Sequence, residues 1–407
     1  MAAVLQEDVV IVGAGIAGLA TSLALHRVGI KSLVLESASS LRATGFALST
    51  WDNAWRALDA LGLGEALRQQ HQLLDGVVAY STATGRSSAE IPFSGHEIRC
   101  VQRKLLLEAM DKALPDGTIR YSSNVVSVED SDSESGCLFK LLHLSDGAVI
   151  KTKVLIGCDG VNSRVAKWLG FNEASFAGRT GVRGIATYPE GHDFSSKFRM
   201  FVGKGFRAGC IPCDDKTMYW FFTWTPTAQE KDLHDNPAKL KEFILTKLQN
   251  APGVKEVVQK TEVDRILSSP LRFRRPWQIL MGNISRGNAC IAGDALHPMT
   301  PDLGQGGCSA LEDGVILGRC LAEALKKDSA GLGSKEEYER IVAGLKKYAK
   351  ERRWRSFDLI TTSYLVGFVQ QSEGKIGTFV RDHVLAKFLS GLLLKRAEFD
   401  CGKLISM

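Results

Sequence analysis

The sequence of 407 residues lacks any apolar run long enough to cross a membrane, since a membrane-spanning helix needs about 20 consecutive, mostly apolar residues. We also expect no secretory leader, because the sequence enters a strand-like run at Asp8 without the apolar stretch that precedes a cleavage site. We therefore expect no transmembrane segment and a cytoplasmic location.

A strongly basic segment is missing as well. Lys and Arg number 51 against 45 Asp and Glu, and the net charge of +6 is dispersed along the chain. No arginine-rich arm or basic stripe of the kind used by nucleic-acid-binding proteins is present. We expect no nucleic-acid partner.

Paired cysteine motifs are scarce. The nine cysteines are odd in number and scattered. The segment Cys210-Ile211-Pro212-Cys213 is a C-x-x-C pair, but no second pair lies at zinc spacing and no thioredoxin-like βαβ pattern surrounds it. The pattern predicts reduced, packed thiols and no metal site.

The sequence is organised around a glycine-rich turn near its N-terminus. A β-branched and aliphatic run from Asp8 to Val12 leads into the turn, and good helix formers follow from Leu19 to Val28. The turn has the pattern G-x-G-x-x-G and comprises Gly13, Ala14, Gly15, Ile16, Ala17 and Gly18. Glycines between a buried parallel strand and a helix N-terminus are typical of a dinucleotide-binding site, where free N–H groups face the phosphates.

Each glycine of this turn has a steric purpose. Gly13 permits the tight turn, Gly15 lets a pyrophosphate approach the backbone, and Gly18 lets the helix pack on the strand. The second strand, 32–35, ends at Glu36, which lies 18 residues beyond Gly18. This is close to the spacing of about 20 for the acid that binds a ribose 2′-OH, and it argues against a 2′-phosphate. A glycine-rich turn in an unrelated α/β protein is the alternative.

The remaining pattern divides the chain into three regions. From Gly181 onward short alternating strands replace the strand–helix pattern, which indicates an antiparallel sheet inserted after the nucleotide-binding part. The predicted boundaries are 1–75, 98–180 and 280–330 for the nucleotide-binding domain, 76–97 and 181–279 for a substrate-binding sheet domain, and 331–407 for a helical region. The fold class is α/β, with a Rossmann-like domain.

Some elements are predicted in more detail. The segment 119–128 is interpreted as one strand, and 359–394 carries apolar residues at helical spacing with Gly367 and Gly377 as breaks. In the aromatic strand 218–224, alternation places Met218, Trp220, Phe222 and Trp224 on one face and Tyr219 with Phe221 on the other. The sequence leaves open which face packs in the core and which lines a cavity.

Three separated signatures carry a family resemblance. Besides the glycine turn, they are Cys158-Asp159-Gly160-Val161-Asn162-Ser163, and Gly293-Asp294-Ala295-Leu296-His297-Pro298 running into Pro301-Asp302-Leu303-Gly304-Gln305-Gly306-Gly307. In this order the chain resembles the single-component FAD aromatic hydroxylases, the para-hydroxybenzoate and salicylate hydroxylase group. Its end, from Glu398 to Leu404, is similar to the plant monooxygenases of that group. The resemblance covers essentially the whole chain.

The resemblance implies an FAD-dependent monooxygenase that uses NAD(P)H and O2 to hydroxylate an aromatic or similarly flat, electron-rich small molecule through a C4a-hydroperoxyflavin. The implied cofactor-binding residues lie in all three signatures and in two loops between them. They are Gly13, Ala14, Gly15, Ile16, Ala17 and Gly18 with Glu36 for the dinucleotide, Arg42 and Arg103 for the pyrophosphate or ribityl chain, Asp159 for FAD and NAD(P)H, Asp294 for the ribityl chain, and Gly304, Gln305, Gly306 and Gly307 for the flavin ring.

The chain departs from the family pattern at one position. The family usually has D-G-x-x-S-x-x-R, but Ala166 stands at the arginine position, flanked by Arg164 and Lys167. We expect one of these two cations to substitute for the family arginine in the contact with NAD(P)H.

Several of these residues also allow a purely structural interpretation. Arg42 could be an ordinary loop residue, and Arg103 could belong only to a helix start. His297 is interpreted as structural, and Glu312 and Asp313 as solvated or capping. No catalytic side chain is predicted, because the flavin carries the chemistry.

Two other functions compete with hydroxylation. No second G-x-G-x-x-G follows a strand, so a second nucleotide fold, as in disulfide reductases and Baeyer–Villiger monooxygenases, is not expected. A flavin oxidase or dehydrogenase on the same fold is one alternative. A non-enzymatic carrier of the GDP-dissociation-inhibitor type is the other, although Glu36, Asp159 and Asp294 together argue against it.

Overall fold

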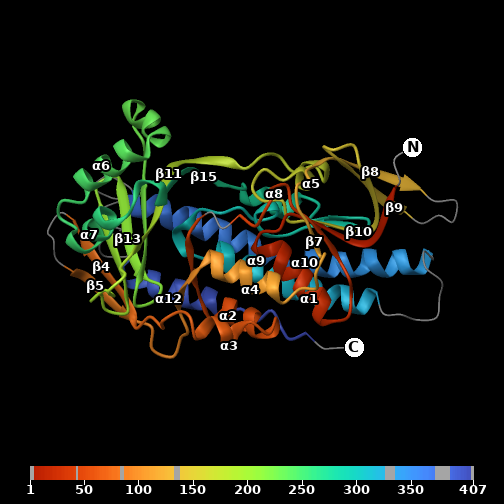
Figure 1. Cartoon of the computed structure of the whole chain (residues 1–407), viewed down its shortest axis with the longest axis horizontal. Helices are drawn as coiled ribbons and strands as arrows, with labels where there is room; N and C mark the ends of the chain where they lie inside the picture. The colour runs from red at the N-terminus through yellow and green to blue at the C-terminus, as the bar shows by residue number, and fades with distance from the viewer. Residues whose placement is uncertain are drawn as a thin grey trace.

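The computed structural model describes residues 4–42, 45–82, 87–132, 138–325, 335–371 and 386–404. These residues form a mixed α/β fold with a mainly parallel sheet, a mainly antiparallel sheet and a set of long helices (Figure 1). The fold class predicted from the sequence is therefore confirmed.

The mainly parallel sheet contains the N-terminal strand at its centre. Its order is β16-β17-β10-β1-β2-β7, and β9 pairs antiparallel with β10 and with β8. The strands are β1 (Leu5–Val12), β2 (Leu33–Leu35), β7 (Ile119–Arg120), β8 (Val125–Asp132), β9 (Leu138–Leu144), β10 (Val149–Gly157), β16 (Ser285–Arg286) and β17 (Ala289–Ile291). Since β1, β2, β10 and β17 run parallel, their carboxyl ends meet at one edge of the sheet.

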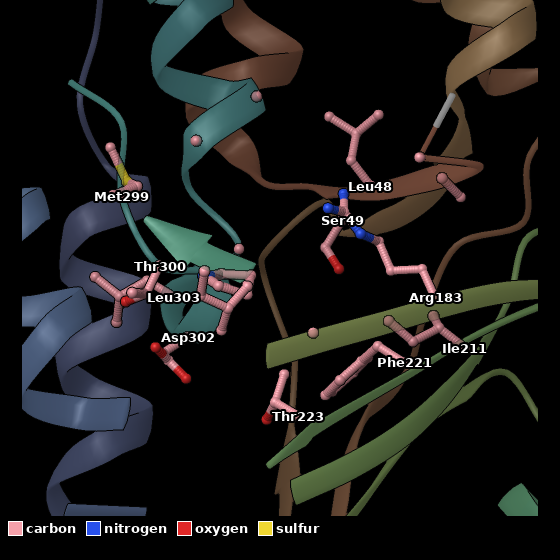
Figure 2. A pocket seen from close by; sticks show the side chains of 18 of the residues that line it. Leu48, Ser49, Arg183, Ile211, Phe221, Thr223, Met299, Thr300, Asp302 and Leu303 are labelled. Atoms are coloured by element: carbon pink, nitrogen blue, oxygen red, sulfur yellow. The ribbon is translucent and has the colours of Figure 1, made fainter. Parts of the chain in front are cut away.

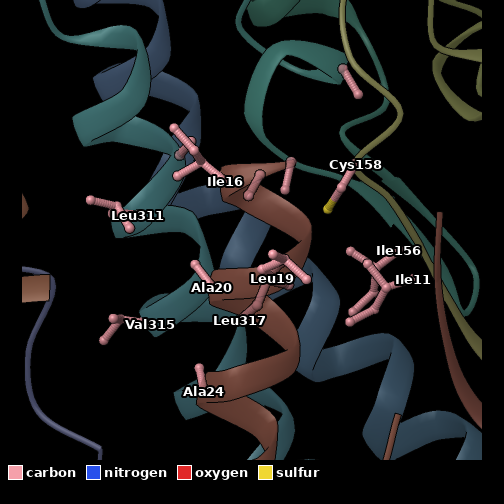
Figure 3. Packing of buried hydrophobic residues seen from close by; sticks show 14 of the residues in the cluster. Ile11, Ile16, Leu19, Ala20, Ala24, Ile156, Cys158, Leu311, Val315 and Leu317 are labelled. Carbon is pink, nitrogen blue, oxygen red and sulfur yellow. The ribbon is translucent and has the colours of Figure 1, made fainter. Parts of the chain in front are cut away.

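Helix α1 (Ile16–Arg27) is packed between this sheet and helix α9 (Gly306–Ala324), as Figure 3 shows for Leu19, Ala20 and Val315. Small residues allow the two helices to approach closely. A Cβ added at Gly314 would lie 2.6 Å from the backbone carbonyl carbon of Ala20. Helices α2 (Asp52–Ala60), α3 (Gly64–Arg68), α4 (Arg103–Lys112), α5 (Arg164–Trp168) and α10 (Lys335–Gln371) surround this part.

The second sheet has the order β15-β11-β14-β13-β12-β4-β5. Its strands are β4 (Gly76–Ser81), β5 (Ser87–Pro92), β11 (Ser175–Thr187), β12 (Lys197–Gly203), β13 (Phe206–Pro212), β14 (Thr217–Trp224) and β15 (Ile266–Phe273). All neighbours are antiparallel except β12 and β4. Figure 1 shows this sheet at one end of the molecule, with α6 (Pro237–Lys247) and α7 (Pro252–Lys260) outside it.

Short elements connect the two sheets. The two-stranded ribbon of β3 (Ala47–Thr50) and β6 (Arg99–Gln102) lies beside α4, and α8 (Pro276–Met281) packs on α10. The 3₁₀ turns are η1 (Ala228–Asp235), η2 (Val263–Arg265), η3 (Gly293–Ala295) and η4 (Pro301–Leu303), and α12 (Ala386–Ala397) is the last described helix. Among the described residues, every helix is too short or too polar to span a bilayer.

Two detailed predictions are wrong. The segment 119–128 forms two strands, β7 and β8, because the chain turns at Ser122, whose φ is 53°. Gly367 does not break a helix but lies inside α10. Its missing side chain leaves room for an ion pair, since an added Cβ would lie 2.2 Å from Asp302 Oδ2 and 2.3 Å from an Arg179 nitrogen. The other predicted break, Gly377, lies outside the described residues.

Candidate active site

A cavity of about 460 Å³ lies between the second sheet and the loop that leads into α9 (Figure 2). Ligand pockets commonly have volumes of roughly 300 to 1,000 Å³. On one side, the cavity is lined by the loop residues Thr300 to Gly304 and by Gly306 and Gly307. On the other side, side chains such as Phe221 and Thr223 extend from the sheet (Figure 2).

The glycine turn follows β1 at the carboxyl edge of the parallel sheet. Gly13 has φ 102°, and a Cβ there would lie 2.5 Å from the carbonyl oxygen of Cys158. A Cβ at Gly18 would lie 1.9 Å from the carbonyl oxygen of Gly13. A Cβ at Gly15 would meet no protein atom within 4 Å. Gly13 and Gly18 are therefore required by the fold, whereas the space over Gly15 is open to a ligand.

Glu36 lies at the end of β2 and is 5% exposed. Its Oε2 accepts a hydrogen bond from the Ala14 N–H at 3.0 Å, and its Oε1 accepts from Ala38 N–H and from Arg42. Burial raises the pKa of Glu36, but the two backbone N–H groups and Arg42 outweigh it and hold the pKa below the ordinary 4.5. Glu36 is thus an ionised acceptor beside the glycine turn, and Arg42, with a side chain 60% exposed, is attached to it.

The second signature packs against the first. Asp159 Cα would lie 3.1 Å from a Cβ at Gly13. The Asp159 carboxylate accepts hydrogen bonds from Ser163 Oγ at 2.5 Å and from the N–H of Arg164 at 2.7 Å. Burial raises the pKa of Asp159, although these bonds oppose the shift. In this structure Asp159 caps the start of α5.

The position that departs from the family pattern is occupied by a buried methyl group. Ala166 is 2% exposed, and its N–H donates to Ser163 Oγ. Arg164 and Lys167 are exposed on α5, and neither lines the cavity. The expectation that one of them substitutes for the family arginine stays a prediction.

Asp294, Gly304, Gly306 and Gly307 of the third signature line the cavity, whereas Gln305 does not. Gly293 has φ 58°, and a Cβ there would lie 2.5 Å from Ala17 Cβ, which fixes the turn carrying Asp294 against α1. Gly304 has φ 64° and ends η4. Gln305 precedes the first turn of α9, and Gly306 and Gly307 open that helix with N–H groups that have no partner within it. The cavity therefore lies at a helix N-terminus, where negative charge is stabilised.

These features fit a flavin dinucleotide. The open space over Gly15 would accept a pyrophosphate, and Glu36 Oε2 has a lone pair left for one ribose hydroxyl. Two buried donors, Trp51 Nε1 and Gln305 Nε2, have no hydrogen-bond partner among the described residues. Trp51 lines the cavity, and its Nε1 would lie 3.2 Å from a Cβ at Gly304. The Trp51 donor on the cavity wall is therefore available to an acceptor on a ligand in the cavity.

The aromatic strand β14 presents its two faces as the alternation predicts, and the structure decides their roles. Met218, Trp220, Phe222 and Trp224 belong to the core beneath α6 and α7. Tyr219, Phe221 and Thr223 line the cavity. Burial raises the pKa of Tyr219, so its hydroxyl is neutral at physiological pH.

Arginines outnumber acids on the cavity wall. Arg103, Arg183, Arg207 and Arg272 line it together with Asp294 and Asp302. Asp302 binds Arg179 through two hydrogen bonds of 3.0 and 2.8 Å, and Arg207 NH1 lies 3.3 Å from Asp302 Oδ1. Burial lowers the pKa of Arg103, which Asp294 opposes. The cavity is therefore electropositive and suits an acidic ligand.

One expectation about acidic residues is wrong. Glu312 and Asp313, predicted as solvated or capping, are fully buried on α9. Asp313 contacts His297 Nε2 at 2.7 Å and Arg352 Nε at 2.6 Å, and Glu312 contacts Arg352 at 2.7 Å. The sequence did not reveal this because Arg352 lies 39 residues further along, on α10. His297 is buried in this network, away from the cavity wall.

Several cavity residues carry no sequence motif. Trp51, Arg183, Arg207 and the α12 residues Leu393 and Leu394 line the cavity but lie in four different elements or loops. For the two arginines the sequence holds only an indirect signal. Arg183 on β11 pairs across strands with Phe221, and Arg207 on β13 pairs with Thr223, so strand alternation places both arginines on the face that Phe221 and Thr223 share. Finding them required the sheet register.

Comparisons with known proteins agree on one group. A family model described as FAD binding domain matches residues 6–350. Monooxygenase 2 of Arabidopsis thaliana is 53% identical over 408 residues, which is 98% of each protein. Monooxygenase 1 of the same plant is 37% identical over 98% of this chain and 100% of that protein. The crystal structure of Klebsiella pneumoniae HpxO with FAD and uric acid has a TM-score of 0.82 at 22% identity, covering 97% of this chain and 96% of that one.

Proposed function

This chain belongs to the family of FAD-dependent monooxygenases with the FAD binding domain, and on that premise we propose that it hydroxylates a flat, electron-rich small molecule with NAD(P)H and O2 as co-substrates. The observation that carries the proposal is one cavity whose two sides differ in chemical character. A helix N-terminus with glycines forms one side, and aromatic and cationic side chains form the other.

The dinucleotide is held by residues at the carboxyl edge of the parallel sheet. The turn from Gly13 to Gly18 receives the pyrophosphate, Glu36 accepts a ribose hydroxyl, and Asp294 accepts from the ribityl chain. Arg103 offsets phosphate charge from the cavity wall. Bound FAD supplies the redox chemistry and the activation of O2.

The chain contributes orientation, electrostatics and a dry site. Gly304, Gly306 and Gly307 bring backbone against the ring position, where N–H groups at the start of α9 stabilise negative charge. Phe221 and Tyr219 offer aromatic surface to a flat substrate, and Arg183 and Arg207 favour one with an acidic or strongly polar substituent. Leu393 and Leu394 exclude water.

The test is NAD(P)H oxidation by FAD-loaded protein across a panel of phenolic acids, related plant metabolites and uric acid, the ligand in the HpxO structure. We expect one compound to stimulate oxidation and to incorporate an atom from ¹⁸O₂, detected by mass spectrometry. Turnover that yields only H2O2 with every compound would favour an oxidase. A protein that stays colourless after FAD addition would refute the proposal.

A matched pair of variants ties activity to the cavity. Arg183 and Arg199 lie in the same sheet, but Arg183 lines the cavity, whereas Arg199 lies close to Gly253 of α7. Arg183→Gln should raise KM for an acidic substrate about ten-fold, the loss expected for one charged hydrogen bond, with FAD affinity unchanged. Arg199→Gln should leave both values unchanged. Equal effects of the two variants would remove Arg183 from the substrate site.

A further inference from the structure

A fully buried group of charged side chains lies behind the cavity, between α9 and α10. Arg352, Glu312, Asp313 and His297 are each 0% exposed. Arg352 is at the centre, with Nε on Asp313, NH1 on Glu312 and NH2 on Ser309 Oγ, at 2.6, 2.7 and 2.7 Å. No atom of Arg352 lines the cavity. Its function therefore has to be transmitted through the residues it binds.

One arm of the network reaches the Gly-Asp turn. Asp313 Oδ2 accepts hydrogen bonds from the Gly293 N–H and from His297 Nε2, both at 2.7 Å. Gly293 immediately precedes Asp294, which lines the cavity. Arg352 thus fixes the carboxylate that holds the backbone of this turn.

The other arm of the network reaches the loop from Gly304 to Gly307, which leads into α9. Glu312 Oε1 accepts from Asn53 Nδ2 at 2.5 Å, and the same amide nitrogen donates to Gln305 Oε1 at 2.9 Å. Gln305 stands between Gly304 and Gly306, both on the cavity wall. Arg355 supports this arm through a 2.7 Å contact with Glu312 Oε1.

The second arm also fixes hydrogen-bond polarity. An ionised carboxylate only accepts, so Glu312 requires Asn53 to present its NH2 group. Since that NH2 also faces Gln305, the Gln305 amide must turn its oxygen toward Asn53. Gln305 Nε2 is then left as a buried donor without a partner among the described residues. Burial raises the pKa of Glu312, but Arg352 and Arg355 outweigh it and hold the pKa below 4.5, so the carboxylate stays ionised.

We propose that Arg352 is a positioning residue for the flavin site: through Asp313 and Glu312 it holds the Asp294 turn and the loop from Gly304 to Gly307 in place, and it fixes the orientation of the Gln305 amide beside that loop. This inference rests on the proposed function, since it requires that FAD occupy the cavity. No side chain other than Arg352 bonds both Glu312 and Asp313 among the described hydrogen bonds.

The experiment compares the affinities of apoprotein for FAD and for ADP, which carries only the part held by the glycine turn and Glu36. Arg352→Gln should weaken FAD binding about a hundred-fold and Arg352→Lys about ten-fold, because lysine can serve one carboxylate but not both. ADP affinity should stay within about two-fold of wild type, since the network does not include its site. The absorption spectrum of bound flavin should shift in both variants.

The matched control is Arg353→Gln. Arg353 is the next residue on α10 and is also tied to backbone carbonyls, those of Ile279, Leu280 and Gly282, but it lies outside the network. This variant should keep the wild-type FAD affinity and flavin spectrum. If Arg352→Gln does not fold, Asn53→Leu serves instead, because it cuts only the Gln305 arm without changing charge and should still shift the spectrum.

Two results would overturn the inference: an unchanged FAD affinity and spectrum in the Arg352 variants, or a loss of ADP affinity in parallel with that of FAD, which indicates general damage. A wild-type protein that binds FAD but oxygenates no substrate would refute the proposed function while leaving this inference standing.

Discussion

The two sides of the cavity are built by different means. The side formed by the loop that leads into α9 brings backbone to the cavity at Gly304, Gly306 and Gly307, and Gly304 has a positive φ and a close neighbour in Trp51. The opposite side is made of side chains, such as Arg183 and Phe221, on an ordinary antiparallel sheet. Backbone geometry limits which residues are allowed, whereas a sheet face accepts many side chains. The first side should thus respond sharply to added atoms, and the second gradually to altered chemistry.

The largest effect is expected at Gly15. Gly15→Val should fold, because its Cβ meets no protein atom within 4 Å and the backbone is extended with φ −77°. FAD affinity should fall at least about a hundred-fold, because the side chain fills the pyrophosphate position. The measurements are flavin content and thermal unfolding. Gly18→Val is the contrasting variant, since its Cβ would lie 1.9 Å from a carbonyl oxygen and should lower stability itself. Full flavin occupancy in Gly15→Val would mean that the cofactor has been misplaced.

Glu36 should have the next largest effect. Its Oε1 is already occupied by Ala38 and Arg42, so only Oε2 can accept from the ribose. Losing one charged hydrogen bond, worth roughly 1.5–3 kcal/mol, should weaken FAD binding by roughly ten- to a hundred-fold in Glu36→Ala. Titration of apoprotein measures this. An unchanged dissociation constant would show that the carboxylate serves only the Ala14 and Ala38 N–H groups.

A substitution at Gly304 tests whether the loop side of the cavity controls how much of the NAD(P)H oxidation leads to hydroxylated product. Gly304→Val adds a branched side chain at φ 64° and within 3.2 Å of Trp51 Nε1. We expect flavin to remain bound while the ratio of hydroxylated product to NAD(P)H consumed falls several-fold and H2O2 rises, because the ring can no longer settle. Gly170→Val is the control: it has φ 92° but no atom within 4 Å of its Cβ. If Gly304→Val stays fully coupled, the loop does not contact the flavin.

The smallest effect concerns pH and the network behind the cavity. Burial raises the pKa values of Glu312 and Asp313, but their cationic partners outweigh it and hold both below the ordinary 4.5 and 3.8. Their stabilisation is therefore complete above about pH 4.5 and is lost as the pH falls through the lowered folded-state values. The free energy of unfolding, measured with urea at a series of pH values below 4.5, should fall with pH in the wild-type protein. In Glu312→Gln the slope of this free energy against pH should be shallower by up to about 1.4 kcal/mol per pH unit. Identical slopes would mean that Glu312 does not titrate with unfolding.

The sequence by itself determined the fold class and the flavin family. This was possible because a tight turn and a close helix–strand approach each require glycine at a fixed spacing, as Gly13 and Gly18 show. Alternation also separated Trp220 from Tyr219, since strand periodicity is local. The domain boundaries and the roles of the site residues remain proposals.

The tertiary structure alone decided which face of β14 lines the cavity, which arginines face it, and that Glu312 and Asp313 are buried ion-pair partners. These properties depend on contacts between residues far apart in the chain, such as Arg352 with Asp313 or Arg207 with Asp302. An isolated carboxylate on a helix looks the same in sequence whether water or a guanidinium surrounds it. Only packing determines which of the two it meets, and therefore its charge, its pKa and its function.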